Sequence, residues 1–231
     1  MNKYRNEWKY YLSEANFALI ENKLDKVLSL DIHTNKTNNK YLIHSLYFDD
    51  YTNSCIFDND AGLGKRYKWR IRYYDDDLSY ITLERKEKNN SLCRKRSCSI
   101  TINEYKEIIS RNYSNIYWQT DNELLRQFCI EAMNRLFIPK VIIDYERTAY
   151  VEPITNVRIT FDKNISASLD LDKFITGDYI RQPLLQKDRH ILEVKFDDIL
   201  PSYIKQAAHI RDLQQTTFSK YYLSRKVLER N

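Results

Sequence analysis

Polar and apolar positions alternate along much of this chain, and this pattern predicts a protein rich in antiparallel strands. The clearest example is the segment KRYKWRIRYY at 65–74. Read with the two-residue period of a strand, it places four cations on one face and aromatic or aliphatic side chains on the other; the four cations are Arg66, Lys68, Arg70 and Arg72. The same period predicts strands at about 4–12, 41–49, 66–74, 79–88, 92–100, 140–150, 156–162, 166–172 and 189–197.

Helical periodicity fills the intervals between several of these strands. Ser13 can cap an apolar stripe over 13–30, and Thr101 with Glu104 forms a capping box at the start of 101–110. Further helices are predicted at 121–137, at 201–209 and from about residue 217. No long linker, low-complexity run or internal repeat divides residues 1–231, so we expect a single α+β domain with helices packed outside an antiparallel sheet.

The polar faces of the other predicted strands share the basic bias of 65–74. Their polar residues are Glu7, Lys9, Thr82, Glu84, Lys86, Lys88, Arg94, Arg96, Tyr145, Arg147, Arg158, Thr160, Asp162, Glu193 and Lys195. For any one strand, a solvated outer face is the ordinary interpretation. Because several strands share the bias, we favour a sheet closed around a basic lumen. Cations in such an interior need a polyanion as partner, and arginine forks match phosphate oxygens.

Like charges on one strand face repel one another. The sequence alone therefore suggests that replacing Arg70 or Arg72 by alanine relieves repulsion and spares the fold.

Composition and motifs exclude several classes of protein. The 37 basic and 32 acidic residues leave a net charge of only +5, which argues against a nucleic-acid coat protein, and we expect no nucleic-acid partner. Four cysteines without CxxC spacing and four scattered histidines argue against zinc or disulfides. The three glycines form no phosphate loop, so any phosphate must be bound by side chains. Neither a membrane-spanning run nor a signal peptide is visible, which predicts a cytoplasmic location.

An ordered set of segments resembles a known family. The segments are HSLYFDD, KRYKWRIRYY, LERKEK, IDYERTAY, RITFD, ILEVKF and FSKYY, spread from about Arg5 to Leu223. Together they resemble the VTC domain, the polyphosphate polymerase branch of the triphosphate tunnel enzymes, which are related to the CYTH proteins. The resemblance implies an antiparallel closed β-barrel tunnel of about eight strands with flanking helices, open at both ends.

The resemblance also implies an activity and a set of site residues. The activity is transfer of the γ-phosphate of ATP to a growing inorganic polyphosphate chain, with Mn²⁺ or Mg²⁺ as cofactor. The implied catalytic residues are Arg70, Arg72, Lys86, Arg147, Arg158 and Lys220, with Glu193 as metal ligand. The implied substrate-binding residues are Lys9, Lys68, Lys88, Arg94, Arg96, Tyr145, Lys195 and Ser219. The chain departs from many relatives at Thr217, where they carry a basic residue.

Two other functions remain open at this point. A hydrolase or cyclase of the same tunnel class usually carries an E-x-E-x-K strand, whereas here Glu7 and Lys9 have no second carboxylate beside them, which favours a polymerase. A non-catalytic domain that binds polyphosphate, inositol phosphates or RNA is the second alternative. Ser219 is explained equally well as a helix cap, and Glu193 as the ion-pair partner of Lys195. Chain length, preferred metal and oligomeric state are not encoded in any motif.

Overall fold

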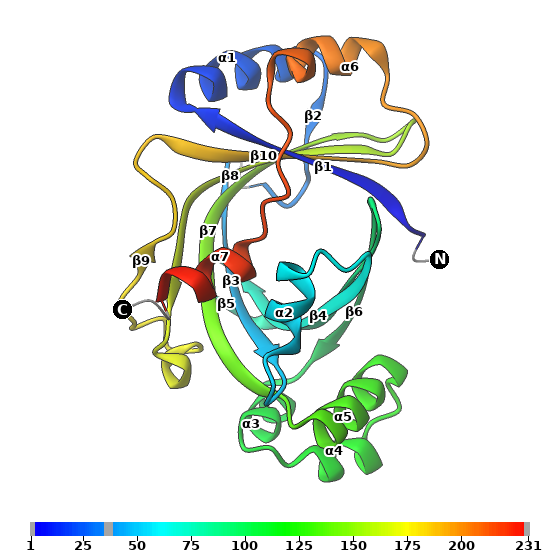
Figure 1. Ribbon diagram of the computed structural model, residues 1–231, viewed down its shortest axis with the longest axis vertical. Coiled ribbons are helices and arrows are strands. Elements are labelled where there is room, and N and C mark those ends of the chain that lie inside the picture. Colours follow the sequence, from blue (N-terminus) through cyan, green and yellow to red (C-terminus); the bar gives the residue numbers. More distant parts are fainter. Residues whose placement is uncertain (1–2, 35–38, 229–231) are drawn as a thin grey trace.

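Eight antiparallel strands close into a ring in the computed structural model, which describes residues 3–34 and 39–228 (Figure 1). In ring order they are β7 (Ile138–Glu152), β3 (Tyr41–Asp49), β4 (Lys65–Tyr74), β5 (Asp77–Asn89), β6 (Leu92–Ile100), β1 (Arg5–Ser13), β10 (Arg189–Phe196) and β8 (Val157–Ser168). Pairing of β8 with β7 closes the ring. The short strands β2 (Ser29–Leu30) and β9 (Gln182–Pro183) extend the sheet beside β7 and β8. The predicted α+β class and the tunnel of about eight strands are confirmed.

Helices cover two opposite sides of this ring. At the top of Figure 1 lie α1 (Glu14–Leu24) and α6 (Ser202–Ala207), and at the bottom lie α3 (Ile102–Ile109), α4 (Tyr113–Gln119) and α5 (Glu123–Arg135). Helices α2 (Ser54–Asp60) and α7 (Lys220–Leu228) lie in front of the ring, and short 3₁₀ turns occur at Leu171–Lys173 and Ile210–Asp212. Within residues 3–34 and 39–228, every helix is too short or too polar to cross a membrane.

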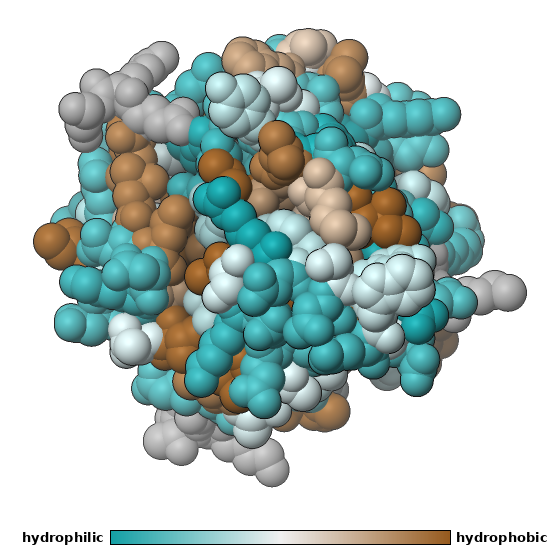
Figure 2. Space-filling model, turned by 90° about the horizontal axis from the view of Figure 1, so that it is seen from below, coloured by the Kyte–Doolittle hydropathy of each residue, from teal (hydrophilic) through white to brown (hydrophobic). Residues whose placement is uncertain are grey.

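The helices decide which face of each strand points into the ring. Two apolar clusters lie between the outer strand faces and the helices. The first contains Trp69, Ile71, Tyr73, Leu83, Leu125 and Phe128, and the second contains Phe17, Ile20, Ile159, Phe161, Val194 and Ile204. The surface seen from below is consequently mostly hydrophilic, with scattered hydrophobic residues (Figure 2). Because the apolar faces are buried outward, the basic faces point into the ring.

Helix α7 differs from the expectation that helices pack only outside the sheet. Its Tyr221 is 1% exposed and belongs to a third apolar cluster with Tyr47 and Ile143, which share strand faces with lumen residues. The Tyr221 hydroxyl donates to Asp49 Oδ2 at 2.5 Å. Helix α7 is therefore anchored against the inner side of the ring at one end.

Several predicted boundaries were wrong. The strands expected at 156–162 and 166–172 form the single strand β8, in which Asn164 has a φ of 50° and a register shift lies opposite, between Asp144 and Glu146. This bulge interrupts the two-residue period, so the sequence pattern breaks there. The helix expected over 13–30 ends at Leu24, because Ser29 and Leu30 pair with β7. Helices α2 and α4 were not predicted.

Candidate active site: a basic tunnel

The inner faces of the strands line a cavity of about 850 Å³. Basic and polar side chains from β1, β4, β5, β7, β8 and β10 converge on it, together with residues at the start of α7. All the residues implied by the family resemblance except Arg96 line this cavity: Lys9, Lys68, Arg70, Arg72, Lys86, Lys88, Arg94, Tyr145, Arg147, Arg158, Glu193, Lys195, Ser219 and Lys220. Residues from distant parts of the sequence thus share one lumen.

The expected position of Arg96 was wrong. Its guanidinium donates to Glu87 and to Gln127 of α5, so it lies on the outer face of the ring. In the register of β5 and β6, Lys95 faces Lys86 and takes the inward position. Because three basic residues follow one another at 94–96, polarity alone does not show which of them points inward. Arg94 borders the cavity and also donates to Glu87.

Buried carboxylates hold the two central groups of cations. Glu84, which is 1% exposed, accepts a hydrogen bond from Arg70 Nε at 2.7 Å, forms an ion pair with Arg70 Nη2 at 2.5 Å and lies 3.8 Å from Arg72. Asp162, which is fully buried, accepts two bonds from Arg147 at 2.6 and 2.7 Å and one from Lys220. Such paired bonds fix the plane and direction of each guanidinium.

Neither Glu84 nor Asp162 was assigned to the site from the sequence, although both stand on strand faces that are otherwise basic. Burial on its own would raise the pKa of Asp162, but the charges of Arg147 and Lys220 outweigh burial and lower it to about 2. The pKa of Glu84 lies well below its usual range, because the charges of Arg70 and Arg72 outweigh burial in the same way. Both groups are therefore carboxylates at neutral pH.

Hydroxyl groups complete the hold on the arginines. The guanidinium of Arg72 donates to Ser45 Oγ at 3.0 Å and to the hydroxyl of Tyr145 at 2.9 Å. Arg70 donates to the hydroxyl of Tyr47 at 2.7 Å. Burial would raise the pKa of Tyr145, but the charges of Arg147, Arg72 and Lys220 outweigh it and lower this pKa. These contacts show how strongly cationic the centre of the tunnel is.

A second set of charges joins β1, β5 and β10. Lys86 donates to Glu7 at 2.8 and 3.1 Å, and Lys195 lies 2.6 Å from Glu193. Lys9 lies between the two carboxylates, 3.5 Å from Glu7 and 3.6 Å from Glu193. The pKa of Glu193 is well below its usual range, because the surrounding lysines outweigh its burial.

Two carboxylates of this set, Glu7 and Glu193, are the candidate ligands of a divalent metal. In the part of the chain that the structure describes, no cluster of three or more histidine, cysteine or acidic side chains is placed to hold a metal. The neighbouring carboxylates of Glu7 and Glu193 nevertheless provide the hard oxygen donors that Mg²⁺ and Mn²⁺ prefer. Mg²⁺ usually binds to one or two carboxylates together with substrate phosphates. The residues therefore fit a metal that binds together with a phosphate ligand.

The start of α7 brings Ser219 and Lys220 into the lumen. Ser219 Oγ accepts the backbone N–H of Tyr222 at 3.3 Å, as a helix cap does, and it also accepts a bond from Lys68 at 3.1 Å. Ser219 therefore caps α7 and also lines the tunnel, while its binding of substrate stays a prediction.

Lys68 lines the cavity, and its charge depends on pH near neutrality. Burial lowers the pKa of Lys68 to about 8, so the free protein loses this charge as the pH rises through 8. A bound polyanion stabilises the charged form of Lys68. The affinity of the protein for a polyanion is therefore highest below pH 8. We expect binding of polyphosphate to weaken by about tenfold between roughly pH 7 and pH 9, as measured by titration calorimetry. The variant Lys68→Arg, which keeps its charge, should show a weaker pH dependence. What remains comes from Tyr47, because the charges of Arg70 and Arg72 outweigh its burial and lower its pKa to about 8. An unchanged pH profile would contradict the role of Lys68.

The closed ring and basic lumen define a triphosphate tunnel fold, and solved structures share it. A protein from Hippeastrum, described as a candidate adenylyl cyclase with a dominant triphosphatase activity, superposes with a TM-score of 0.57 at 14% identity over 96% of each chain. A candidate adenylate cyclase from Bacillus halodurans gives 0.52 at 10% identity over 93% of each chain. No curated protein matches the sequence. The VTC domain model matches residues 4–229, so the chain belongs to the VTC domain family.

Proposed function

We propose that this VTC domain is a polyphosphate polymerase that transfers the γ-phosphate of ATP to the end of an inorganic polyphosphate chain. The observation that carries the proposal is the convergence of arginines and lysines from all around a closed ring on one cavity of about 850 Å³. Two polyanions repel each other in water, and a lumen of this kind neutralises both. ATP as the donor agrees with the cytoplasmic location expected from the sequence.

Phosphoryl transfer needs alignment and charge neutralisation more than covalent help from the protein. A terminal oxygen of the polyphosphate chain attacks the γ-phosphorus of ATP, the bond between that phosphorus and the β–γ bridging oxygen breaks, and ADP leaves. The attacking oxygen is already anionic, so no general base is required. Arg70 and Arg72 are placed to hold equatorial oxygens from one wall, and Arg147 and Lys220 from another.

The proposed cofactor is Mn²⁺ or Mg²⁺. Glu193 and Glu7 would hold the ion together with phosphate oxygens, where it would supply further neutralisation of the transferred group. Lys195 and Lys9, which now contact Glu193, would then be available to phosphate oxygens.

A triphosphate hydrolase of the same tunnel class is the second candidate, and the triphosphatase activity described for the Hippeastrum protein favours it. A hydrolase has to activate water with a base. Here the four carboxylates at the centre of the tunnel each form ion pairs with lysine or arginine: Glu7, Glu84, Asp162 and Glu193. A paired carboxylate with a depressed pKa is a poor base, which favours the polymerase.

The test is incubation of the purified protein with ATP and Mn²⁺, followed by separate measurement of polyphosphate, ADP, free phosphate and cyclic AMP. We expect one ADP to be released for each phosphate added to polyphosphate. Free phosphate without polyphosphate would identify a hydrolase, and cyclic AMP a cyclase.

We further expect the reaction to be processive. A chain in the lumen meets many cations at once, and it leaves only when several contacts break together. At low conversion with excess primer, gel electrophoresis should show long chains beside unextended primer. A one-step ladder across all primers would contradict this expectation. Processivity should fall as salt screens the contacts.

A further inference from the structure

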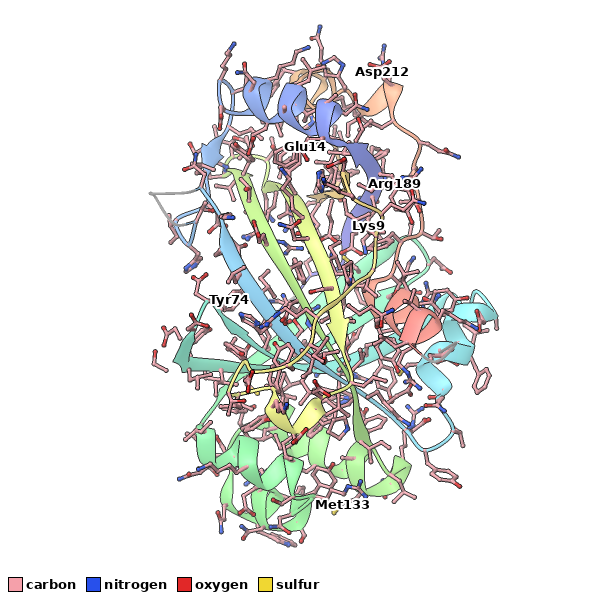
Figure 3. All side chains as sticks on the ribbon, turned by 90° about the vertical axis from the view of Figure 1, so that its left-hand side faces the viewer. Lys9, Glu14, Tyr74, Met133, Arg189 and Asp212 are labelled. Atoms are coloured by element: carbon pink, nitrogen blue, oxygen red, sulfur yellow. The ribbon has the colours of Figure 1, made fainter. Side chains whose placement is uncertain are left out.

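The tunnel is open at two ends, and the pairing of β4 with β5 shows which residues lie at each end. Arg66 at one end of β4 pairs with Lys88, and Tyr74 at the other end pairs with Asp77. The eight steps of extended strand from Arg66 to Tyr74 span roughly 26 Å. Helices α2 and α7 lie at the right of Figure 3, and Tyr74 is labelled at the left. We call the end with Arg66 the α7 mouth and the end with Tyr74 the turn mouth.

Cations at the α7 mouth lack acidic partners. Arg66, Lys68 and Lys88 line the cavity, and in residues 3–34 and 39–228 none of the three forms an ion pair with a carboxylate. Arg66 donates to the backbone oxygen of Leu63, and Lys68 to Ser219. The carboxylate of Asp58 is close enough to favour the charged form of Arg66 without a direct contact.

The pairing of β4 with β5 places cations opposite one another at this mouth, which is unfavourable unless a ligand neutralises them. Arg66 stands directly opposite Lys88, and Lys68 stands directly opposite Lys86, all on the inner face. Like charges in directly opposed positions repel. Burial and the charge of Arg66 lower the pKa of Lys88. A polyanion is the ligand that removes both penalties.

The turn mouth has the reverse arrangement. Arg158 is already paired with Asp31, and it donates to the hydroxyl of Tyr41, whose ring neighbours that of Tyr74. Asp75 and Asp77 border the cavity at this end, and each accepts a backbone N–H, from Leu42 and Ser79 respectively. In the described part of the chain, neither of these two carboxylates forms an ion pair with a basic side chain. A chain of phosphates is therefore less favourable here.

A second hollow adjoins the α7 mouth. It measures about 220 Å³ and lies between the β5–β6 turn and the segment that leads into α7. Lys9 and Lys88 line it together with Ser91 and residues 215–218, and both lysines also line the main cavity. The basic lining therefore continues from the centre of the tunnel past the α7 mouth.

We propose that the polyphosphate chain beyond the reacting phosphates lies at the α7 mouth, on a binding site formed by Arg66, Lys68 and Lys88. The turn mouth, where Arg158 is paired and the carboxylates of Asp75 and Asp77 border the cavity, then remains for the less charged nucleoside end of ATP. This inference rests on the proposed function and adds to it a direction for the chain. It also assigns a binding role to Arg66, which the family resemblance did not include among the site residues.

The test compares two probes without ATP or metal, so that no turnover occurs: a long linear polyphosphate and tripolyphosphate. The double variant Arg66→Gln, Lys88→Gln removes two charges at the α7 mouth. We expect the dissociation constant for long polyphosphate to rise about tenfold and the slope of its logarithm against log salt to fall by about 1.4, as for two lost phosphate contacts on a single strand. For tripolyphosphate, which we expect at Arg70 and Arg72, the dissociation constant should stay within about twofold of its value for the unaltered protein.

A charge-swapped variant separates position from total charge. This variant combines Arg66→Glu and Lys88→Glu with Asp75→Lys and Asp77→Lys. Its net charge is unchanged, but the difference in charge between the two mouths is reversed. Weaker binding of long polyphosphate with normal binding of tripolyphosphate supports the inference. Unchanged binding of long polyphosphate, or an equal loss for both probes, overturns it while the proposed function stands. If the unaltered protein binds neither probe, the proposed function fails as well.

Discussion

Replacing Arg72 by alanine is expected to lower the rate of polyphosphate synthesis by about 10³-fold, the range seen when an arginine that stabilises a transferring phosphoryl group is lost. The thermal midpoint should change little. Arg72 donates to the uncharged hydroxyls of Ser45 and Tyr145, so its loss leaves no buried charge without a partner, and Glu84 keeps its bonds to Arg70 and Lys95. Steady-state kinetics and a thermal melt check both halves of the expectation. A variant that keeps more than a tenth of the activity would show that Arg72 does not contact the reacting phosphates.

Arg70→Ala is the informative comparison, because it removes the same charge from the same strand face. The sequence suggested that either replacement relieves repulsion and spares the fold; Arg70 and Arg72 do repel each other, but Arg70 also pairs with Glu84, which gives a different expectation for the stability of Arg70→Ala. Loss of Arg70 leaves Glu84, 1% exposed, without its closest partner. Glu84 keeps Lys95 at 2.8 Å and Arg72 at 3.8 Å, so the cost lies below the about 3–5 kcal/mol of a buried charge left without any partner. We therefore expect a clear fall in the thermal midpoint for Arg70→Ala. The double variant Arg70→Met, Glu84→Met, which removes both charges, should recover most of it.

Glu193→Gln is expected to lower metal-dependent turnover by about 100-fold, as the loss of a group that holds a metal does. Binding of polyphosphate should persist or tighten, because one negative charge leaves a cationic lumen. The direct readout is a titration with Mn²⁺ in the presence of tripolyphosphate, followed by the electron paramagnetic resonance of free Mn²⁺. Weaker Mn²⁺ binding supports a ligand role.

The alternative for Glu193 is a structural carboxylate that only pairs with Lys195 and Lys9. That role predicts unchanged Mn²⁺ binding and a lower thermal midpoint. Glu146→Gln is the matched control, since Glu146 is ion-paired with Lys40 and does not line the cavity. It should leave Mn²⁺ binding and turnover unchanged. Full activity of Glu193→Gln at low Mn²⁺ would refute the assignment.

Much of the candidate site follows from local patterns. A period of two is a property of the strand backbone, so the placement of Arg70 with Arg72, or of Glu193 with Lys195, on one face needs no tertiary information. Arg96 shows where this reasoning stops. Over 94–96 a basic residue falls on both faces of the strand, so the two-residue period does not show which face points inward. Only the pairing of Lys95 with Lys86 shows that Lys95 points inward.

The partners of the cations could not be read from the sequence. Glu84 is fourteen residues from Arg70 in the chain and stands directly opposite it in the β4–β5 register. Asp162 meets Arg147 through β7–β8 pairing, and Lys220 reaches the same carboxylate only because Tyr221 and Asp49 anchor α7 inside the ring. Charge compensation of this kind depends on distances across strands, which strand periodicity does not specify.

The sequence by itself determined the antiparallel strands, the basic face of each and the family to which the chain belongs, because these depend on side-chain order along a backbone of known period. The tertiary structure alone decided that the basic faces point inward, since this requires helices α1 and α6 on one side and α3, α4 and α5 on the other to bury the apolar faces. It also decided that the ring closes through β7 and β8, and that the two mouths differ in charge. Closure and the pairing of charges bring together residues far apart in the chain, and they exist only once those contacts form.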